Sequence, residues 1–137
     1  MSADSIQKAW DTALLAFQST NVALEGTRYE MVGMTPYLSS RMSGLDRIGV
    51  GAGRDGALRW TGIYQINVHY PTGAGLVPIL TKVNAVMAAF RRGTTLTTSD
   101  NLSILCEAPR TAPRIEVAPW LTAPVMVPWF CYEMPTS

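Results

Sequence analysis

The stretch WTGIYQINVHYPTGAGLVPILTKVNAVMAAFRRG, residues 60–93, contains the two clearest structural signals in the chain. Over residues 64–70, apolar and polar side chains alternate with a period of two, which predicts a strand with one buried and one polar face. The Pro-Thr-Gly-Ala-Gly segment that follows, residues 71–75, predicts a turn. The apolar side chains that recur at helical spacing after this turn, and that predict one face of a helix, are Leu76, Ile79, Leu80, Val83, Val86, Met87 and Phe90.

Further elements are predicted on both sides of this strand and helix. The N-terminal segment has apolar residues three and four positions apart from Ile6 to Phe17, which predicts an amphipathic helix. The last segment, 123–133, is apolar on both faces, which indicates a central strand or a strand whose second face meets another subunit. The proline-rich segment 108–119 fits either an extended arm or a loop. The other predicted strands cover residues 22–24, 35–43, 94–97 and 102–107.

Helices and strands in this order predict an α+β fold. Because the strands cluster and hairpins are expected between them, we expect a mostly antiparallel sheet of about four to five strands, with two helices packed on one face. The chain has 137 residues, which is close to the length of one domain. We therefore expect residues 1–137 to form a single domain.

A glycine-rich region separates the predicted strand at 35–43 from the strand that begins at Trp60. Residues 44–56 include five glycines and four charged side chains, which predicts a long flexible loop between two strands. Loops of this length inside a compact domain are usually functional or disordered, so the region is a candidate contact element. Residues 49–53, Gly-Val-Gly-Ala-Gly, resemble a phosphate-binding loop only superficially, because no Gly-Lys-Ser/Thr ending follows them.

Charged residues are scarce, at 15% of the chain where about 25% is usual for a soluble domain. Eleven basic and ten acidic side chains give a formal net charge of +1, which argues against a general binder of nucleic acids or of anionic membranes. No apolar run reaches the roughly 18 residues of a membrane span, and residues 1–5 lack the basic start of a signal peptide. We therefore expect a protein that stays in a cytoplasm and whose surface is covered by something other than charge.

Residues that carry catalysis or bind metals are few. His69 is the single histidine, which excludes a site with two histidine ligands, and its place on the polar face of a strand predicts a surface or interface residue. Cys106 and Cys131 have no catalytic motif around them and are expected to be buried thiols on neighbouring strands. Asp46 and Asp55 both fall in the glycine-rich region, where solvated charges are the ordinary explanation. We expect no catalytic residue, no metal site and no cofactor.

Arginine and aromatic residues are more informative. Nine of the eleven basic side chains are arginine, with lysine only at positions 8 and 82. Arginine is favoured at interfaces because its guanidinium is weakly hydrated and binds carboxylates in a fork, although a GC-rich genome explains the bias equally well. Aromatic residues also exceed what a core with two helices requires, and such residues anchor interfaces. The aromatic residues concerned are Trp60, Trp120, Trp129, Phe130 and Tyr132.

Several short motifs occur in a fixed order along the chain. They are TPYL at 35–38, GIYQINVHYP at 62–71, Gly73 and Gly75, the helix end FRRGTTL at 90–96, and VMVPW at 125–129. Together these motifs resemble a family of tailed-phage proteins related to tail terminators, also called tail-completion or minor tail proteins. The resemblance covers residues 35–132.

The resemblance implies a structural virion protein of the phage tail or neck, assembled in the host cytoplasm. In this family a small α+β subunit forms a ring, typically a hexamer, at the head-proximal end of the completed tail tube. The ring stops tube polymerisation and presents the surface that joins the head. The implied partners are copies of the same chain, the tail-tube protein and a head-completion or connector protein. DNA passes through the ring lumen without sequence-specific binding, and the role needs no membrane, cofactor or catalysis.

Two segments are expected to make these contacts, together with one residue of the last strand. The interface hypothesis comprises Arg47, Gly49, Gly51, Gly53, Arg54 and Arg59 in the region 44–59, Arg110 and Arg114 in the segment 108–119, and Trp129. Two alternatives remain open from the sequence. One is another neck or head-tail connector component of the same particle, and the other is a small ligand-binding or enzymatic domain that uses the glycine-rich loop.

Overall fold

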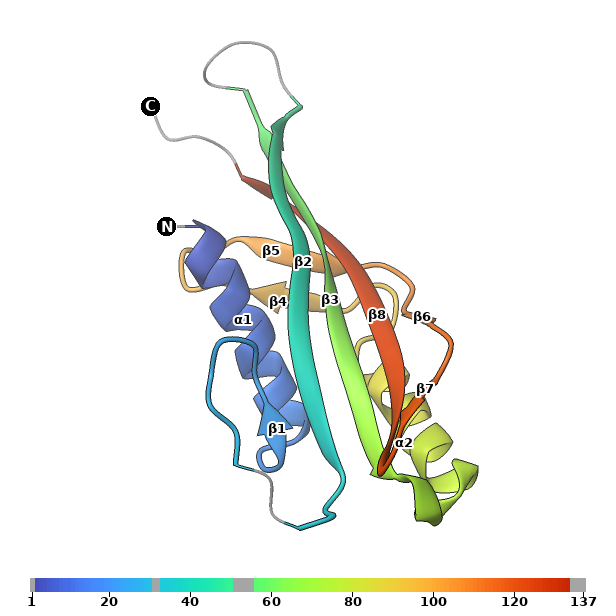
Figure 1. Ribbon diagram of the computed structural model, residues 1–137. Coiled ribbons are helices and arrows are strands. Elements are labelled where there is room, and N and C mark those ends of the chain that lie inside the picture. Colours follow the sequence, from blue (N-terminus) through green and yellow to red (C-terminus); the bar gives the residue numbers. More distant parts are fainter. Residues whose placement is uncertain (1, 31–32, 51–55, 134–137) are drawn as a thin grey trace.

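The computed structural model of the chain describes residues 2–30, 33–50 and 56–133 (Figure 1). The helices are α1 (Ser2–Phe17), the short 3-10 helix η1 (Thr72–Ala74) and α2 (Leu76–Ala89). The strands are β1 (Val22–Ala23), β2 (Tyr37–Gly49), β3 (Leu58–Pro71), β4 (Thr95–Thr97), β5 (Ser103–Cys106), β6 (Arg110–Thr111), β7 (Ile115–Val117) and β8 (Trp120–Glu133).

The strands form one mixed, curled sheet (Figure 1). Its order is β1-β2-β3-β8-β5-β4, and β6 and β7 also pair with β8. β1 runs parallel to β2, whereas the other pairs are antiparallel. The α+β class with two helices is confirmed, but the expected sheet was too small and too uniformly antiparallel. β1 lies where a strand was expected, whereas β6 and β7 are short strands held by pairing with the long strand β8, which a local sequence pattern does not reveal.

β2 and β3 form a long antiparallel hairpin that corrects the predicted loop at 44–59. β2 continues to Gly49 and β3 starts at Leu58, and these two residues are paired across the strands. Both ends of the predicted loop are therefore strand. Gly44, at φ +66, lies where the register of the hairpin shifts, so this glycine marks a bulge in the strand. Residues 51–55 of the predicted loop lie outside the described residues.

Both helices pack on the same face of the sheet, behind the strands in Figure 1. Trp10 of α1 lies at the centre of this layer, because its ring stacks on Tyr64 of β3 with centroids 4.8 Å apart and also contacts Phe90 and Trp129. The helical residues that the sequence spacing places in the core, and that are buried there, are Ile6, Trp10 and Leu14 in α1 and Ile79, Val83 and Val86 in α2.

β8 is the central strand of the sheet. β3 pairs along one of its edges, and β5, β6 and β7 pair one after another along the other edge. The central position of β8 in the sheet is one of the two alternatives that the sequence left open, but no described helix covers the second apolar face of the strand. Toward the helices, the buried residues of β8 are Val125, Val127, Trp129 and Cys131, whereas Met126 and Phe130 on the opposite face are half-buried and Tyr132 is exposed.

The proline-rich segment 108–119 contains two short strands, β6 and β7, which pair with β8, and irregular or turn residues between and around them. The sequence alone left open whether this segment is extended or a loop. Cys106 in β5 and Cys131 in β8 are buried on neighbouring strands, as expected.

Candidate assembly surfaces

The far end of the β2–β3 hairpin and the end of β8 project from the body of the molecule (Figure 1). On the face of this projection away from the helices, Ile48, Arg59 and Tyr132 are paired side by side across β2, β3 and β8. The guanidinium of Arg59 lies 5.0 Å from the ring centroid of Phe130 and 6.0 Å from that of Tyr132. Cation–π contacts of this kind hold the cation against aromatic surface. We call the projection the arm, and it comprises residues 44–50, 56–61 and 130–133.

The opposite face of the arm carries a second arginine on an aromatic ring. The guanidinium of Arg47 lies 5.4 Å from the ring centroid of Trp60. The indole N–H of Trp60 donates to the Glu133 carboxylate at 3.0 Å. These residues border a cavity of about 840 Å³ between the arm, the start of α1 and the turn before β5. Neither Arg47 nor Arg59 forms an ion pair with another described residue, so both cations are held only by aromatic rings.

The structure separates the residues of the interface hypothesis. Arg47, Gly49 and Arg59 belong to the arm, and Arg59 is half-buried there while the other two are exposed. Arg110 in β6 and Arg114 before β7 are exposed along the outer edge of β8. The arginines of the hypothesis thus lie in two separate segments, and the first segment is strand at both of its ends rather than the predicted loop.

The four remaining residues of the hypothesis are Gly51, Gly53, Arg54 and Trp129. Gly51, Gly53 and Arg54 lie outside the described residues. Trp129 is 1% exposed and its ring centroid lies 6.4 Å from that of Trp10, so the core of the subunit accounts for this side chain.

A second exposed surface lies at the other end of the sheet, over β7 and the start of α2 (Figure 1). Val117 of β7 is 68% exposed and Val77 of α2 is 75% exposed. The 3-10 helix that precedes α2 is joined to the turn that follows β7 by a hydrogen bond in which the Thr72 backbone N–H donates to the Pro119 carbonyl at 2.9 Å. Sequence reasoning missed this surface because apolar residues in a helix or strand are ordinarily assigned to the core.

Two residues of α2 correct the prediction for its buried face. Leu76 and Leu80 were grouped with the core residues of the helix, but both are exposed. The apolar stripe of α2 is wider than its contact with the sheet, and the residues at the margin of such a stripe face solvent. Their exposure extends the apolar surface that begins at Val77.

The open face of the sheet, away from the helices, carries an uncharged network of hydrogen bonds. The His69 ring nitrogens contact Ser39 Oγ and Thr122 Oγ1, each at 2.8 Å. The Asn67 amide donates to Ser39 Oγ at 3.2 Å, and the Gln65 amide donates to the Asn67 carbonyl oxygen at 2.8 Å. Burial lowers the pKa of His69 to about 4, so its imidazole is neutral at pH 7. The network is consistent with a folding role for His69 rather than an acid–base role.

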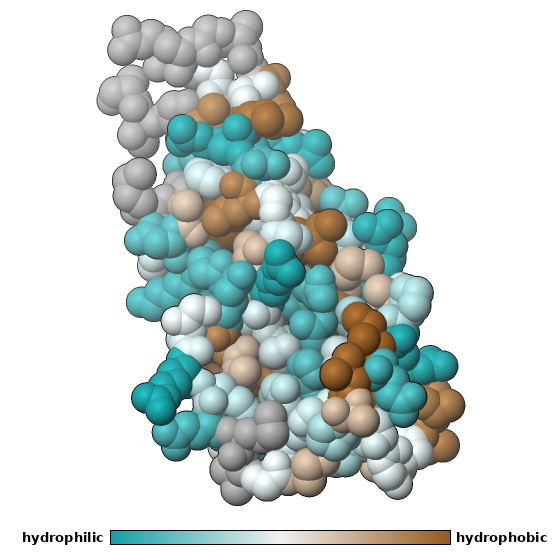
Figure 2. All heavy atoms as spheres, in the orientation of Figure 1, coloured by the Kyte–Doolittle hydropathy of each residue, from teal (hydrophilic) through white to brown (hydrophobic). Residues whose placement is uncertain are grey.

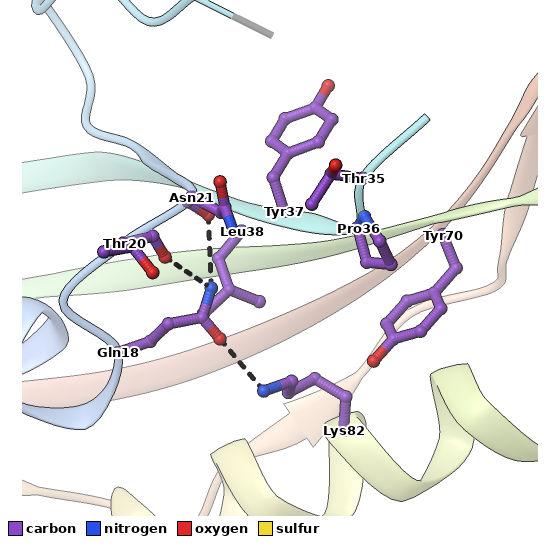
Figure 3. Close-up of a pocket in the computed structure, with 9 residues that line it drawn as sticks. All are labelled: Gln18, Thr20, Asn21, Thr35, Pro36, Tyr37, Leu38, Tyr70 and Lys82. Atoms are coloured by element: carbon purple, nitrogen blue, oxygen red, sulfur yellow. Dashed lines mark hydrogen bonds between the residues drawn. The ribbon is translucent and has the colours of Figure 1, made fainter. Parts of the chain in front are cut away.

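Figure 3 shows a polar pocket of about 360 Å³ between the end of α1, the start of β2 and α2. The Lys82 ammonium donates to the side-chain oxygen of Gln18 at 2.9 Å. The Gln18 amide in turn donates to the backbone carbonyls of Thr20 and Asn21 at 3.0 and 3.2 Å. These polar groups therefore bind one another and connect α1 to α2. None of the described residues of the glycine-rich region borders this pocket, so the pocket does not support a ligand site built on them.

The described residues offer little for catalysis. They contain no group of three or more His, Cys, Asp or Glu side chains that could hold a metal ion. Burial raises the pKa of the Cys106 and Cys131 thiols to about 11, which keeps both protonated and weakly nucleophilic. Across the helices that the structure describes, none is long and apolar enough to span a membrane.

Exposed arginine, aromatic and apolar surfaces on a small α+β subunit are typical of a protein that assembles with other subunits. Residues 4–129 match the protein family described as phage tail terminator protein. The match spans most of the chain, and the chain belongs to the phage tail terminator family. It is therefore a structural protein of the phage tail, and the resemblance inferred from its short motifs is confirmed.

Two solved structures share the fold. One, whose description states no function, aligns with a TM-score of 0.75 and 18% identity over 100% of this chain and 99% of its own. The other is described as the virion of a native gene transfer agent (GTA) particle, and it aligns with a TM-score of 0.65 and 18% identity over 96% of this chain and 97% of its own. No curated protein sequence matches the chain.

Proposed function

We propose that this protein forms a ring at the head-proximal end of the phage tail tube, where it ends polymerisation of the tube and joins the tail to the head. The observation that carries the proposal is the family match over residues 4–129, which contains nearly all of the described helices and strands. The ring consists of copies of this chain, typically a hexamer. Its two faces bind the tail-tube protein and a head-completion or connector protein, and DNA passes through its lumen.

Under this proposal the arm and the β6–β7 segment make the contacts. Arg47, Gly49 and Arg59 act in the arm, and Arg110 and Arg114 act beside β8. The arginines at these positions support this assignment, because none of them forms an ion pair with a described residue of its own subunit. Unpaired arginines on a surface with few charges are available to carboxylates of a partner. The connection between β2 and β3, with Gly51, Gly53 and Arg54, belongs to the same proposed contact.

The proposal is tested by adding the purified chain to tail-tube protein while tubes are growing. We expect tube growth to stop, and we expect each capped tube to carry a ring at one end in negative-stain electron micrographs. Arg47→Ala removes an exposed arginine of the arm and should cap tubes less efficiently. Its matched control is Arg28→Ala, because Arg28 is an exposed arginine in the connection between β1 and β2. The control should cap tubes as the wild type does. Continued tube growth at a molar excess of the wild-type chain would contradict the proposal.

A further inference from the structure

Exposed large hydrophobic side chains gather at two opposite ends of the sheet. Figure 2 shows brown surface at the lower right, over β7 and α2, and again toward the top, beside the end of the β2–β3 hairpin. The arm patch comprises Ile48, Arg59, Leu105, Phe130 and Tyr132, and the base patch comprises Leu76, Val77, Leu80, Ile115 and Val117.

The base patch includes exposed apolar side chains of α2. Ile79, Val83 and Val86 face the sheet, whereas Leu76, Val77 and Leu80 are exposed. The outer side of the helix also carries the neutral polar residues Thr81 and Asn84. Lys82 is the one charged residue of α2, and its ammonium is occupied by Gln18. The outer side of α2 is therefore uncharged and partly apolar.

The arm patch contains a cation whose hydrogen bonding is incomplete. The Nε atom of Arg59 is buried and has no hydrogen-bond partner among the described residues. A pocket of about 420 Å³ lies beside it, bordered also by Leu105 and Phe130. A buried donor without an acceptor is unfavourable, so an acceptor supplied by a partner at this position stabilises the contact. Glu116 of β7 offers an exposed carboxylate. Because Glu116 pairs with Leu121, its side chain points to the helix side of the sheet, whereas Ile115 and Val117 point to the open side.

We propose that the arm patch of one copy packs against the base patch of the next copy. This contact rests on the ring of the proposed function and specifies which surfaces form it. Two different patches at opposite ends of one subunit make a head-to-tail contact, and such a contact closes into a ring when the rotation between subunits permits. In the contact the guanidinium of Arg59 binds Glu116 of the neighbouring copy, and Val77 of α2, which packs on the side of the sheet to which Glu116 points, covers the exposed ring of Tyr132.

The test uses two variants of the full chain, each with one patch disabled. The base variant carries Val77→Asp and Val117→Asp, and the arm variant carries Ile48→Asp and Tyr132→Asp. All four positions are exposed, so both variants should fold. The measurement is sedimentation velocity and native mass spectrometry of each variant alone and of a 1:1 mixture. The control variant is Met34→Asp, at an exposed apolar residue outside both patches.

We expect each disabled variant to remain a monomer of about 14.9 kDa, and the mixture to give a heterodimer of twice that mass and nothing larger. Formation of the heterodimer also shows that both variants are folded. The control should form the same ring as the wild type. Rings from a disabled variant alone, or a homodimer of either variant, would overturn the head-to-tail contact. A wild-type chain that stays monomeric with and without tube protein would also overturn it, whereas wild-type rings that do not cap tubes contradict only the proposed function.

Discussion

On the helix side of β3, Tyr64, Ile66 and Val68 are fully buried, whereas on the other side Gln65, Asn67 and His69 remain half-exposed. Alternate residues of β3 thus belong to two different faces of the sheet, one covered by the helices and one open. The covered face is stabilised by apolar packing against α1 and α2. The open face is held by hydrogen bonds between neutral side chains. The open face therefore contributes less than the covered face to the free energy of unfolding. Because its side chains are neutral, a partner can bind to it without the cost of desolvating charges.

The largest effect should come from breaking the covered face at Trp10. Trp10→Ala removes a fully buried ring that contacts Tyr64, Phe90 and Trp129, and we expect a loss of about 3–5 kcal/mol in the free energy of unfolding. Urea denaturation followed by circular dichroism measures it. The control is Leu15→Ala on the exposed side of the same helix, which should cost under about 1 kcal/mol. Equal losses in the two variants would show that α1 does not stabilise the sheet as described.

A smaller effect should follow from adding one methyl group to the covered face. In Gly62→Ala the new Cβ would lie 2.8 Å from Cζ2 of Trp129, a buried ring that cannot move freely. Overpacking of this kind costs about 1–3 kcal/mol, measurable by the same denaturation. Gly49→Ala in the arm is the matched variant, because nothing lies within 4 Å of its new Cβ. If Gly62→Ala is as stable as the wild type, the close approach of β3 to Trp129 is not required.

Secondary structure was predicted best from the sequence where one face of a helix or strand is buried and the other is exposed to solvent. The alternation in β3 and the spacing in α1 arise from that asymmetry, and both elements were found where expected. The arm has no such asymmetry, because both faces of β2 from 44 to 49 are largely exposed. Glycines and charges without a period are then indistinguishable from a loop. β6 and β7 were undecidable for another reason, since their extended conformation comes from pairing with β8, which is distant in sequence for β6.

The candidate surfaces were predicted only in part. A low charge content and an excess of arginine indicated contacts, and positions such as Arg47 and Arg110 lie on exposed strands. Composition could not identify Val77 or Val117, because an apolar residue in a helix or strand gives the same signal whether it faces the core or a partner. Only the packing of α2 on the sheet shows which of its apolar residues are buried in the core and which are exposed.

Lowering the pH should reduce the free energy of unfolding through protonation of His69 on the open face. Burial lowers its pKa to about 4, compared with about 6.5 in an unfolded chain. Between these values the unfolded chain binds a proton that the folded chain does not, so stability present above pH 6.5 is lost as the pH falls toward 4. Because the ring is partly exposed to solvent, we expect a loss of about 1–2 kcal/mol. Urea midpoints at pH 7 and pH 4.5 measure it, and His69→Gln, which cannot titrate, should lose less over this interval. An equal loss in both chains would assign the pH dependence to other groups.

The finest comparison removes one hydroxyl group from each face. Tyr64→Phe deletes a donor that binds the Asp11 carboxylate at 2.7 Å between the sheet and α1. Ser39→Ala deletes the oxygen that contacts His69 and Asn67 on the open face. Because a hydrogen bond to a charged group is stronger than one between neutral groups, we expect about 1.5 kcal/mol for Tyr64→Phe and about 0.5–1 kcal/mol for Ser39→Ala. Denaturation at pH 7 gives both values under one set of conditions. A larger loss for Ser39→Ala would show that the open face contributes more to the stability of the monomer than its solvent exposure implies, and that its polar network is built for folding before assembly.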